Sequence, residues 1–132
     1  MSDDKLRILI VDDEPDLLVV LKFGLEADGF EVIQASDGEQ GLALARQYMP
    51  DLMVLDLMLP RMDGYKVCRA LKFDERYKRI PIFILSARTG ETDRRLALEL
   101  GADEVHTKPY DMRTLIRRIR ARIAQDLGRK AA

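Results

Sequence analysis

The chain has 132 residues, of which 47% are hydrophobic and 34% are charged, and its formal net charge at pH 7 is −1. This length and balance suit a globular domain and exclude a disordered chain, and no apolar run approaches the roughly 18 residues that a membrane span needs. The single cysteine, Cys68, cannot form a disulfide within the chain, and the start MSDDKLR does not fit a secretory signal peptide, so we expect a cytoplasmic protein.

Short runs typical of β-strands alternate with helical patterns along the chain. In chain order the expected strands cover residues 6–11, 31–35, 52–57, 81–86 and 104–107, and the expected helices cover residues 15–27, 37–48, 64–72, 90–100 and 111–127. Several strands are nearly continuous aliphatic runs, which is the pattern of strands covered on both faces. This alternation predicts right-handed βαβ units, and therefore an α/β fold with a five-stranded parallel sheet and helices on both faces. An antiparallel α+β domain is disfavoured, because no two strand runs are joined by a turn of hairpin length.

Local signals mark the ends of several helices. Asp28-Gly29 predicts a left-handed C-cap after the first helix, and Ser36 with Glu39 predicts a capping box at the start of the second. We expect residues 1–132 to form a single domain, with a core at about residues 5–127 and a short basic tail at 128–132.

Reactive polar residues stand at the carboxyl ends of four of the five expected strands. Asp12-Asp13 follow the first strand, Asp56 lies at the end of the third, Ser86 ends the fourth and Lys108 follows the fifth. Open parallel sheets bind their ligands at this edge, so these side chains are the candidates for a functional site.

The three aspartates suggest a site for a hard cation. Asp56 ends a core strand, where a buried carboxylate is costly unless it is paired. Three carboxylates in one pocket repel each other unless a cation lies among them, and ligands that are all oxygen favour Mg²⁺. The alternative, an acidic first turn that stabilises the first helix, accounts for Glu14 and Asp16 but leaves Asp56 and Lys108 unexplained.

Together these residues resemble the receiver domain of two-component response regulators. The resemblance rests on Asp12-Asp13, Asp56 with Pro60 and Met62-Asp63-Gly64, Ser86-Ala87, and Lys108-Pro109, and it spans about residues 5–127. It implies a flavodoxin-like, doubly wound fold with the strand order 2-1-3-4-5. It fits a stand-alone receiver and a receiver excised from a longer regulator equally.

The resemblance also implies a role for each catalytic residue. Asp56 would accept a phosphoryl group from a sensor histidine kinase or a histidine phosphotransfer protein, forming an acyl phosphate. Ser86 and Lys108 would bind the phosphoryl oxygens, and the peptide bond between Lys108 and Pro109 would be cis. Such a protein is a signalling switch that catalyses only its own phosphorylation and dephosphorylation.

The resemblance implies a magnesium site and a set of partners as well. Asp13 would ligate Mg²⁺ directly, Asp12 largely through water, and Asp56 and the backbone carbonyl of Met58 would complete the protein ligands. Phosphorylation would change the surface of the fourth helix, fifth strand and fifth helix to control a partner or output that the sequence does not identify. We expect no direct contact of this domain with nucleic acid or with a membrane.

One position departs from the family pattern. Receiver domains commonly carry Tyr or Phe three residues before the lysine, where this chain has Val105. The two-residue periodicity of a strand turns His106 to the opposite face, so His106 does not replace that aromatic ring. We predict that the fourth helix and fifth strand shift without an aromatic switch, and we interpret His106 as structural and Cys68 as a small buried hydrophobe.

The small net charge hides an uneven distribution. Residues 1–16 hold six acidic and two basic side chains, whereas residues 112–132 hold seven basic and one acidic side chain. The arginines opposite the apolar stripe of the last helix are Arg113, Arg117, Arg118, Arg120 and Arg122. They favour a solvated face or a docking surface for an acidic partner over a nucleic-acid site. Asp103, Glu104 and Arg118 resemble part of the set of charged residues through which DNA-binding response regulators dimerise. We therefore expect a monomer or a phosphorylation-dependent homodimer.

Two other functions use a similar architecture. Haloacid-dehalogenase-type phosphatases need an acidic proton donor two residues after the nucleophile, and this chain has Met58 there. Flavin or dinucleotide carriers hold phosphate in loops rich in Gly, Ser or Thr, whereas the first loop here is Asp12-Asp13-Glu14-Pro15 and would repel phosphate without a metal. The phosphorylation switch therefore remains the preferred interpretation.

Overall fold

Strands and helices alternate along the chain in the predicted order. The computed structural model describes residues 5–87 and 90–131. Within them the strands are β1 (Arg7–Val11), β2 (Glu31–Ala35), β3 (Leu52–Leu55), β4 (Ile82–Ser86) and β5 (Glu104–Thr107). The helices are α1 (Pro15–Ala27), α2 (Gly38–Tyr48), α3 (Gly64–Lys72), α4 (Glu91–Glu99) and α5 (Met112–Ala131). No helix in these ranges is long and apolar enough to cross a membrane.

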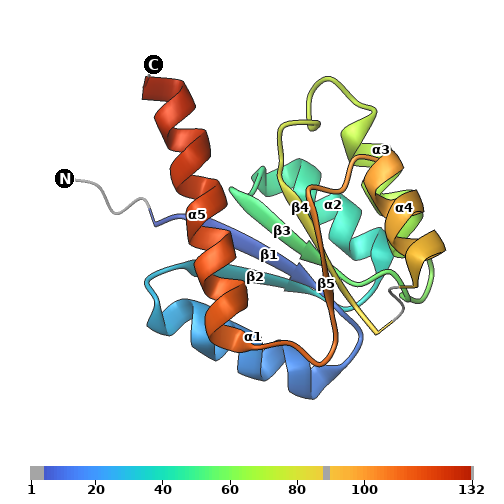
Figure 1. The fold of residues 1–132 in the computed structure, drawn as a ribbon, viewed down its shortest axis with the longest axis horizontal. Coiled ribbons are helices and arrows are strands. Elements are labelled where there is room, and N and C mark those ends of the chain that lie inside the picture. The colour runs from blue at the N-terminus through green and yellow to red at the C-terminus, as the bar shows by residue number, and fades with distance from the viewer. Residues whose placement is uncertain (1–4, 88–89, 132) are drawn as a thin grey trace.

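The strands form one parallel sheet in the order β2-β1-β3-β4-β5 (Figure 1). This confirms the predicted fold class and the order that the resemblance implied. In the centre of the sheet, Leu9 of β1 is paired with Ile33 of β2 and with Met53 of β3. Because β1 and β3 are direct neighbours, the residues that follow them emerge side by side at the carboxyl edge of the sheet.

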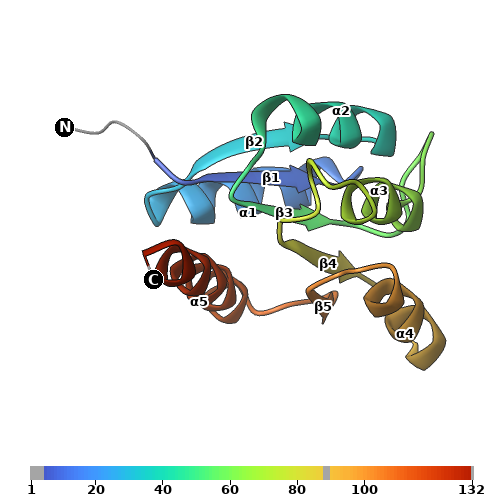
Figure 2. The same ribbon diagram turned by 90° about the horizontal axis from the view of Figure 1, so that it is seen from above.

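Helices cover both faces of the sheet, and each face has its own apolar cluster. Figure 2 shows α2 and α3 on one side of the sheet and α5 on the other. Side chains of α2, α3 and α4 pack with Leu9, Met53 and Ile84, whereas side chains of α1 and α5 pack with Ile8 and Phe83. Alternate residues of each central strand thus enter opposite clusters, which is why these strands read as unbroken aliphatic runs.

Two element ends differ from the sequence prediction by more than one residue. Strand β3 was predicted to reach residue 57 but ends at Leu55, because the chain turns after the amide of Asp56 donates to the carbonyl of Val11 at 3.0 Å. Helix α5 was predicted to end at 127 with a basic tail, but it continues to Ala131. Its last turns contain Arg and Ala, which are good helix formers, and Asp126 lies 3.2 Å from Arg122 one turn earlier.

The predicted cap of α2 is displaced by one residue. Asp37, rather than Ser36, is the N-cap, and its side chain accepts a hydrogen bond from the amide of Gln40 at 2.7 Å. The side chain of Gln40 in turn accepts from the amide of Ser36 at 3.1 Å, where the prediction assigned Glu39. The cap after α1 is confirmed, with Gly29 in the left-handed region at a φ of 95°.

Candidate functional site

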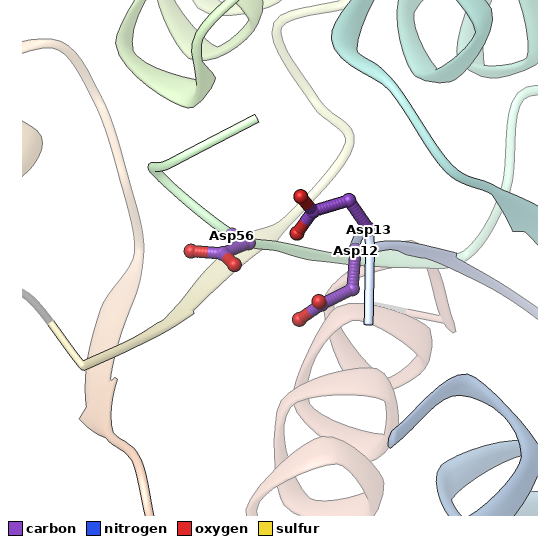
Figure 3. A group of neighbouring side chains, drawn as sticks. All are labelled: Asp12, Asp13 and Asp56. Carbon is purple, nitrogen blue, oxygen red and sulfur yellow. The ribbon is translucent and has the colours of Figure 1, made fainter. Parts of the chain in front are cut away.

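Three acidic side chains lie together beyond the ends of β1 and β3 (Figure 3). Asp12 and Asp13 follow β1 and Asp56 follows β3, and each offers a carboxylate oxygen within 4.8 Å of the others. Asp12 and Asp56 are buried, with 3% and 6% of their surface exposed, while Asp13 is exposed. The sheet order therefore brings together the aspartates that the sequence singled out, in an acidic cluster that could bind a metal ion.

The backbone fixes both buried carboxylates. The amide of Glu14 donates to Asp12 Oδ1 at 3.0 Å, and the amide of Met58 donates to Asp56 Oδ1 at 3.1 Å. Each carboxylate is thus held by the amide two residues further along the chain, so it is oriented by its own loop. The side chain of Met58 is itself exposed.

Lys108 reaches the acidic cluster from the end of β5. Its ammonium donates to Asp12 Oδ2 at 2.7 Å, to Glu14 Oε1 at 2.6 Å and to Asp56 Oδ2 at 3.1 Å. Burial lowers the pKa of Lys108, but the hydrogen bonds to Asp12 and Glu14 outweigh burial and raise that pKa, so the ammonium stays charged. The peptide bond between Lys108 and Pro109 is cis, as the resemblance implied.

The electrostatics of the cluster are unbalanced. Among the residues that the structure describes, one ammonium faces the four carboxyl groups of Asp12, Asp13, Glu14 and Asp56. Burial raises the pKa of Asp12 above its ordinary value, and the hydrogen bonds from Lys108 and from the Glu14 amide only partly offset it. The excess of negative charge at the site therefore favours the binding of a further cation.

Ser86 and Glu14 complete the immediate surroundings. Ser86 ends β4, is almost fully buried, and its carbonyl accepts the amide of Lys108 at 3.0 Å. Because β4 lies between β3 and β5, Ser86 shares the edge of the sheet with Asp56 and Lys108. From the sequence, Glu14 was assigned to the start of α1, and its bond to Lys108 was missed. The one sequence feature that could have indicated this bond is the position of Glu14 directly after Asp12-Asp13.

The architecture and the acidic cluster agree with the comparison to known families. Residues 8–120 match the model of the response regulator receiver domain. The chain belongs to this family. Response regulators are signalling switches that receive phosphoryl groups from histidine kinases.

Relatives of this receiver domain are known in sequence and in structure. It is 45% identical over 115 residues to the alkaline phosphatase synthesis transcriptional regulatory protein PhoP of Bacillus subtilis, a match that covers 87% of this chain and 47% of that protein. A putative response regulator from Chloroflexus aurantiacus superimposes with a TM-score of 0.85 at 30% identity, covering 92% of this chain and 99% of that one. A CheY-like receiver domain from Methanospirillum hungatei gives a TM-score of 0.90 at 26% identity, covering 96% and 99%. The chain spans about half the length of the curated relatives it matches.

Strand β5 presents Val105 and His106 to opposite faces, as predicted. Val105 belongs to the cluster beneath α3 and α4. The ring of His106 lies 5.6 Å from the ring of Phe83 between centroids, and its Nε2 is 2.9 Å from Glu104 Oε1. Phe83 belongs to the cluster beneath α1 and α5, so the histidine does not occupy the face of the missing aromatic residue.

Cys68 is a buried hydrophobe, as predicted. It is 1% exposed within the core, and its thiol lies 3.5 Å from the carbonyl of Leu100. Burial raises its pKa to about 12, so the reactive thiolate is disfavoured.

The basic face of α5 is less cationic than the sequence suggested. Arg118 pairs with Glu104, Arg120 pairs with Asp28, and Arg122 lies 2.8 Å from Asp103. These acids come from β5, from the end of α1 and from the turn before β5, so the pairing depends on how α5 packs. The remaining arginines of the predicted set, Arg113 and Arg117, are exposed.

Proposed function

We propose that this receiver domain is a phosphorylation-operated switch in which Asp56 accepts a phosphoryl group from the phosphohistidine of a sensor kinase or phosphotransfer protein. The observation that carries the proposal is a buried carboxylate at the carboxyl edge of the sheet, oriented by the Met58 amide and held 3.1 Å from the ammonium of Lys108. We propose further that residues 1–132 act as one domain whose core covers about residues 5–127.

Mg²⁺ fits the donor set of the acidic cluster. Asp12, Asp13 and Asp56 offer hard oxygen atoms within 4.8 Å of one another, and Mg²⁺ usually takes few protein ligands and keeps several waters. We propose that these three aspartates and the carbonyl of Met58 hold the ion. When bound there, Mg²⁺ supplies positive charge that neutralises the carboxylates and the incoming phosphoryl oxygens.

The residues of the pocket position the transfer and balance its charge. An oxygen of Asp56 forms a bond to phosphorus as the phosphorus–nitrogen bond of the donor breaks, and the departing imidazole nitrogen takes up a proton from the surrounding water. The Met58 amide keeps the carboxylate oriented. Lys108 and Ser86 bind the transferred oxygens, which suits a reaction whose barrier depends mainly on positioning and charge neutralisation.

Phosphorylation also gives a physical route to the output surface. The acyl phosphate carries nearly two negative charges in place of one. Lys108 then turns toward the phosphoryl group and weakens its present bonds to Asp12 and Glu14. Because Lys108 begins the segment that connects β5 to α5, we propose that the change reaches the surface of α4, β5 and α5 without an aromatic residue at position 105.

We propose that the output is carried out by another domain or protein that this receiver domain controls. A relative from Mycolicibacterium smegmatis, 42% identical over 126 residues, is named as the DNA-binding response regulator MtrA, and the match covers 54% of it. We propose that the present domain contacts no nucleic acid itself and acts as a monomer or a phosphorylation-dependent homodimer. Glu104 and Arg118 pair within the chain, so a dimer that used them would exchange this pair for one across the interface.

Labelling with acetyl phosphate tests the proposal. With Mg²⁺ present, the wild type should gain one alkali-labile phosphoryl group in its intact mass, and Asp56→Asn should gain none. Asp16→Asn, which alters an exposed acid of the first turn of α1 outside the cluster, is the matched control and should be labelled like the wild type. Equal labelling of Asp56→Asn, or steady turnover of a phosphomonoester, would contradict the switch.

A further inference from the structure

The first turn of α2 lies directly against the loop that follows Asp56. This loop, residues 57–63, joins β3 to α3. A Cβ atom added to Gly38 would lie 1.7 Å from the carbonyl oxygen of Met62 and 2.6 Å from its carbonyl carbon. The amide of Gly38 also donates to the carbonyl of Pro60 at 3.3 Å. Because both contacts are with backbone atoms, no side chain could rotate away to admit a larger residue.

Further contacts hold the loop in place. Arg61 adopts a left-handed backbone with a φ of 70°, and its guanidinium lies 3.7 Å from Asp37 and 3.9 Å from Glu39, the residues on either side of Gly38. At the other end of the loop, the amide of Gly64 donates to the carbonyl of Leu57 at 2.9 Å. The loop is therefore fixed between the start of α2 and the start of α3.

A displacement at Met62 would be transmitted toward Asp56. The amide of Met62 donates to the carbonyl of Pro60 at 2.8 Å, so residues 60–62 form a tight turn. Two residues before this turn stands Met58, whose amide holds Asp56 Oδ1. The close contact at Gly38 and the amide that orients the proposed phosphoacceptor thus lie in the same loop.

We propose that Gly38 is a positioning residue for the magnesium and phosphorylation site, acting through the loop 57–63 and Met58. The inference rests on the proposed function, because it concerns the site where Asp56 and the Met58 carbonyl would hold Mg²⁺. Gly38 itself belongs to another element and touches neither the ion nor the phosphoryl group. Its effect is on the affinity for the ion rather than on the chemistry of transfer.

A Mg²⁺ titration of ¹⁵N-labelled protein tests this inference, with the amides of Asp13 and Met58 as reporters. For Gly38→Ala we expect the Kd for Mg²⁺ to rise about tenfold or more, the scale seen when residues that support metal ligands are altered. Gly101→Ala is the matched control. It introduces a left-handed alanine 2.7 Å from Lys72 Cβ, beside the amino end of β5, and should lower the melting temperature while leaving the Kd unchanged.

Two results would overturn the inference. The first is a folded Gly38→Ala variant that binds Mg²⁺ like the wild type, and the second is an equal rise of Kd in Gly101→Ala. If Gly38→Ala does not fold, Arg61→Asn decides. Asparagine accepts the left-handed backbone but removes the ion pairs to Asp37 and Glu39, so a rise of about threefold supports the inference and a wild-type Kd contradicts it. Failure of the wild type itself to bind Mg²⁺ would instead reject the proposed function.

Discussion

Charged side chains cluster at both edges of the sheet, and the two clusters are balanced differently. At the amino ends of β4 and β5, Asp103 lies 2.8 Å from Lys72 and 2.8 Å from Arg122, and it accepts the amide of Ile82 at 2.7 Å. Burial raises the pKa of Asp103, but these bonds outweigh burial and the pKa is lowered. In this amino-edge cluster the carboxylate of Asp103 thus has two cationic partners and a backbone amide.

The cluster at the carboxyl edge has the opposite balance. Within the described part of the chain, the ammonium of Lys108 alone pairs with the carboxylates of Asp12, Glu14 and Asp56, and burial raises the pKa of Asp12. A cluster that only stabilises the fold is expected to satisfy its charges, whereas retained repulsion in a pocket marks a functional site. The comparison supports our proposal that the carboxyl edge holds the functional site, and we expect the amino edge to contribute stability.

Removing the acid at the amino edge should have the largest effect on stability. Asp103→Asn leaves Lys72 without its carboxylate partner and leaves Arg122 with Asp126 alone, and we expect the free energy of unfolding to fall by about 3 kcal/mol. Urea denaturation measures this, and labelling by acetyl phosphate should stay at the wild-type rate. A loss below about 1 kcal/mol, the range of exposed ion pairs, would show that the amino-edge cluster is not structural.

Removing one lysine from each edge distinguishes the roles of the two clusters. Lys108→Met removes the ammonium beside Asp56, and we expect the rate of acetyl phosphate labelling to fall by about 100-fold. Lys72→Met is the matched control at the amino edge and should lower the stability while changing that rate by less than about twofold. Similar labelling rates in the two variants would contradict the division between the edges.

Acid should weaken the amino edge in a defined direction. The pKa of Asp103 in the folded state lies below its ordinary value of 3.8, so its ion pairs stabilise the fold at pH values above 3.8. This contribution is lost as the pH falls through the folded pKa. The stability difference between the wild type and Asp103→Asn should therefore be constant near neutral pH and shrink below about pH 4, as urea titrations at each pH would reveal. A difference that grows in acid would contradict this assignment.

Removing one acid at the carboxyl edge should have the smallest effect, with the opposite sign. Asp13 is exposed and adds negative charge to the acidic cluster. We expect Asp13→Asn to raise the free energy of unfolding by about 0.5 kcal/mol without Mg²⁺, and to weaken Mg²⁺ binding. Melting curves with and without Mg²⁺ measure both effects. If Asp13→Asn is less stable than the wild type in the absence of metal, repulsion between the carboxylates does not destabilise the carboxyl edge.

Features encoded in consecutive residues were predictable from sequence. The aliphatic runs of β1 and β4 indicated strands covered on both faces, and Asp12, Asp56 and Lys108 stood where parallel strands deliver their ends to one edge. Helices α1 and α3 begin and end at the predicted residues. Strand periodicity also placed Val105 and His106 on opposite faces.

Features that depend on packing between distant segments were not predictable. The bond between Lys108 and Glu14 joins residues that are 94 positions apart. The partners of Arg120 and Arg122 depend on the placement of α5 beside α1 and β5, so a helical pattern alone suggested a more cationic face. The contact of Gly38 with the loop 57–63 likewise requires α2 and α3 to be side by side.

Chemical mapping of the phosphorylated residue tests the central claim most directly. Borohydride reduces an aspartyl phosphate to homoserine, so the wild type labelled with acetyl phosphate and Mg²⁺ can be reduced, digested and sequenced by tandem mass spectrometry. We predict homoserine at position 56 alone, and none when Mg²⁺ is removed by a chelator. Homoserine at Asp12 or Asp13, or labelling that is independent of Mg²⁺, would contradict it.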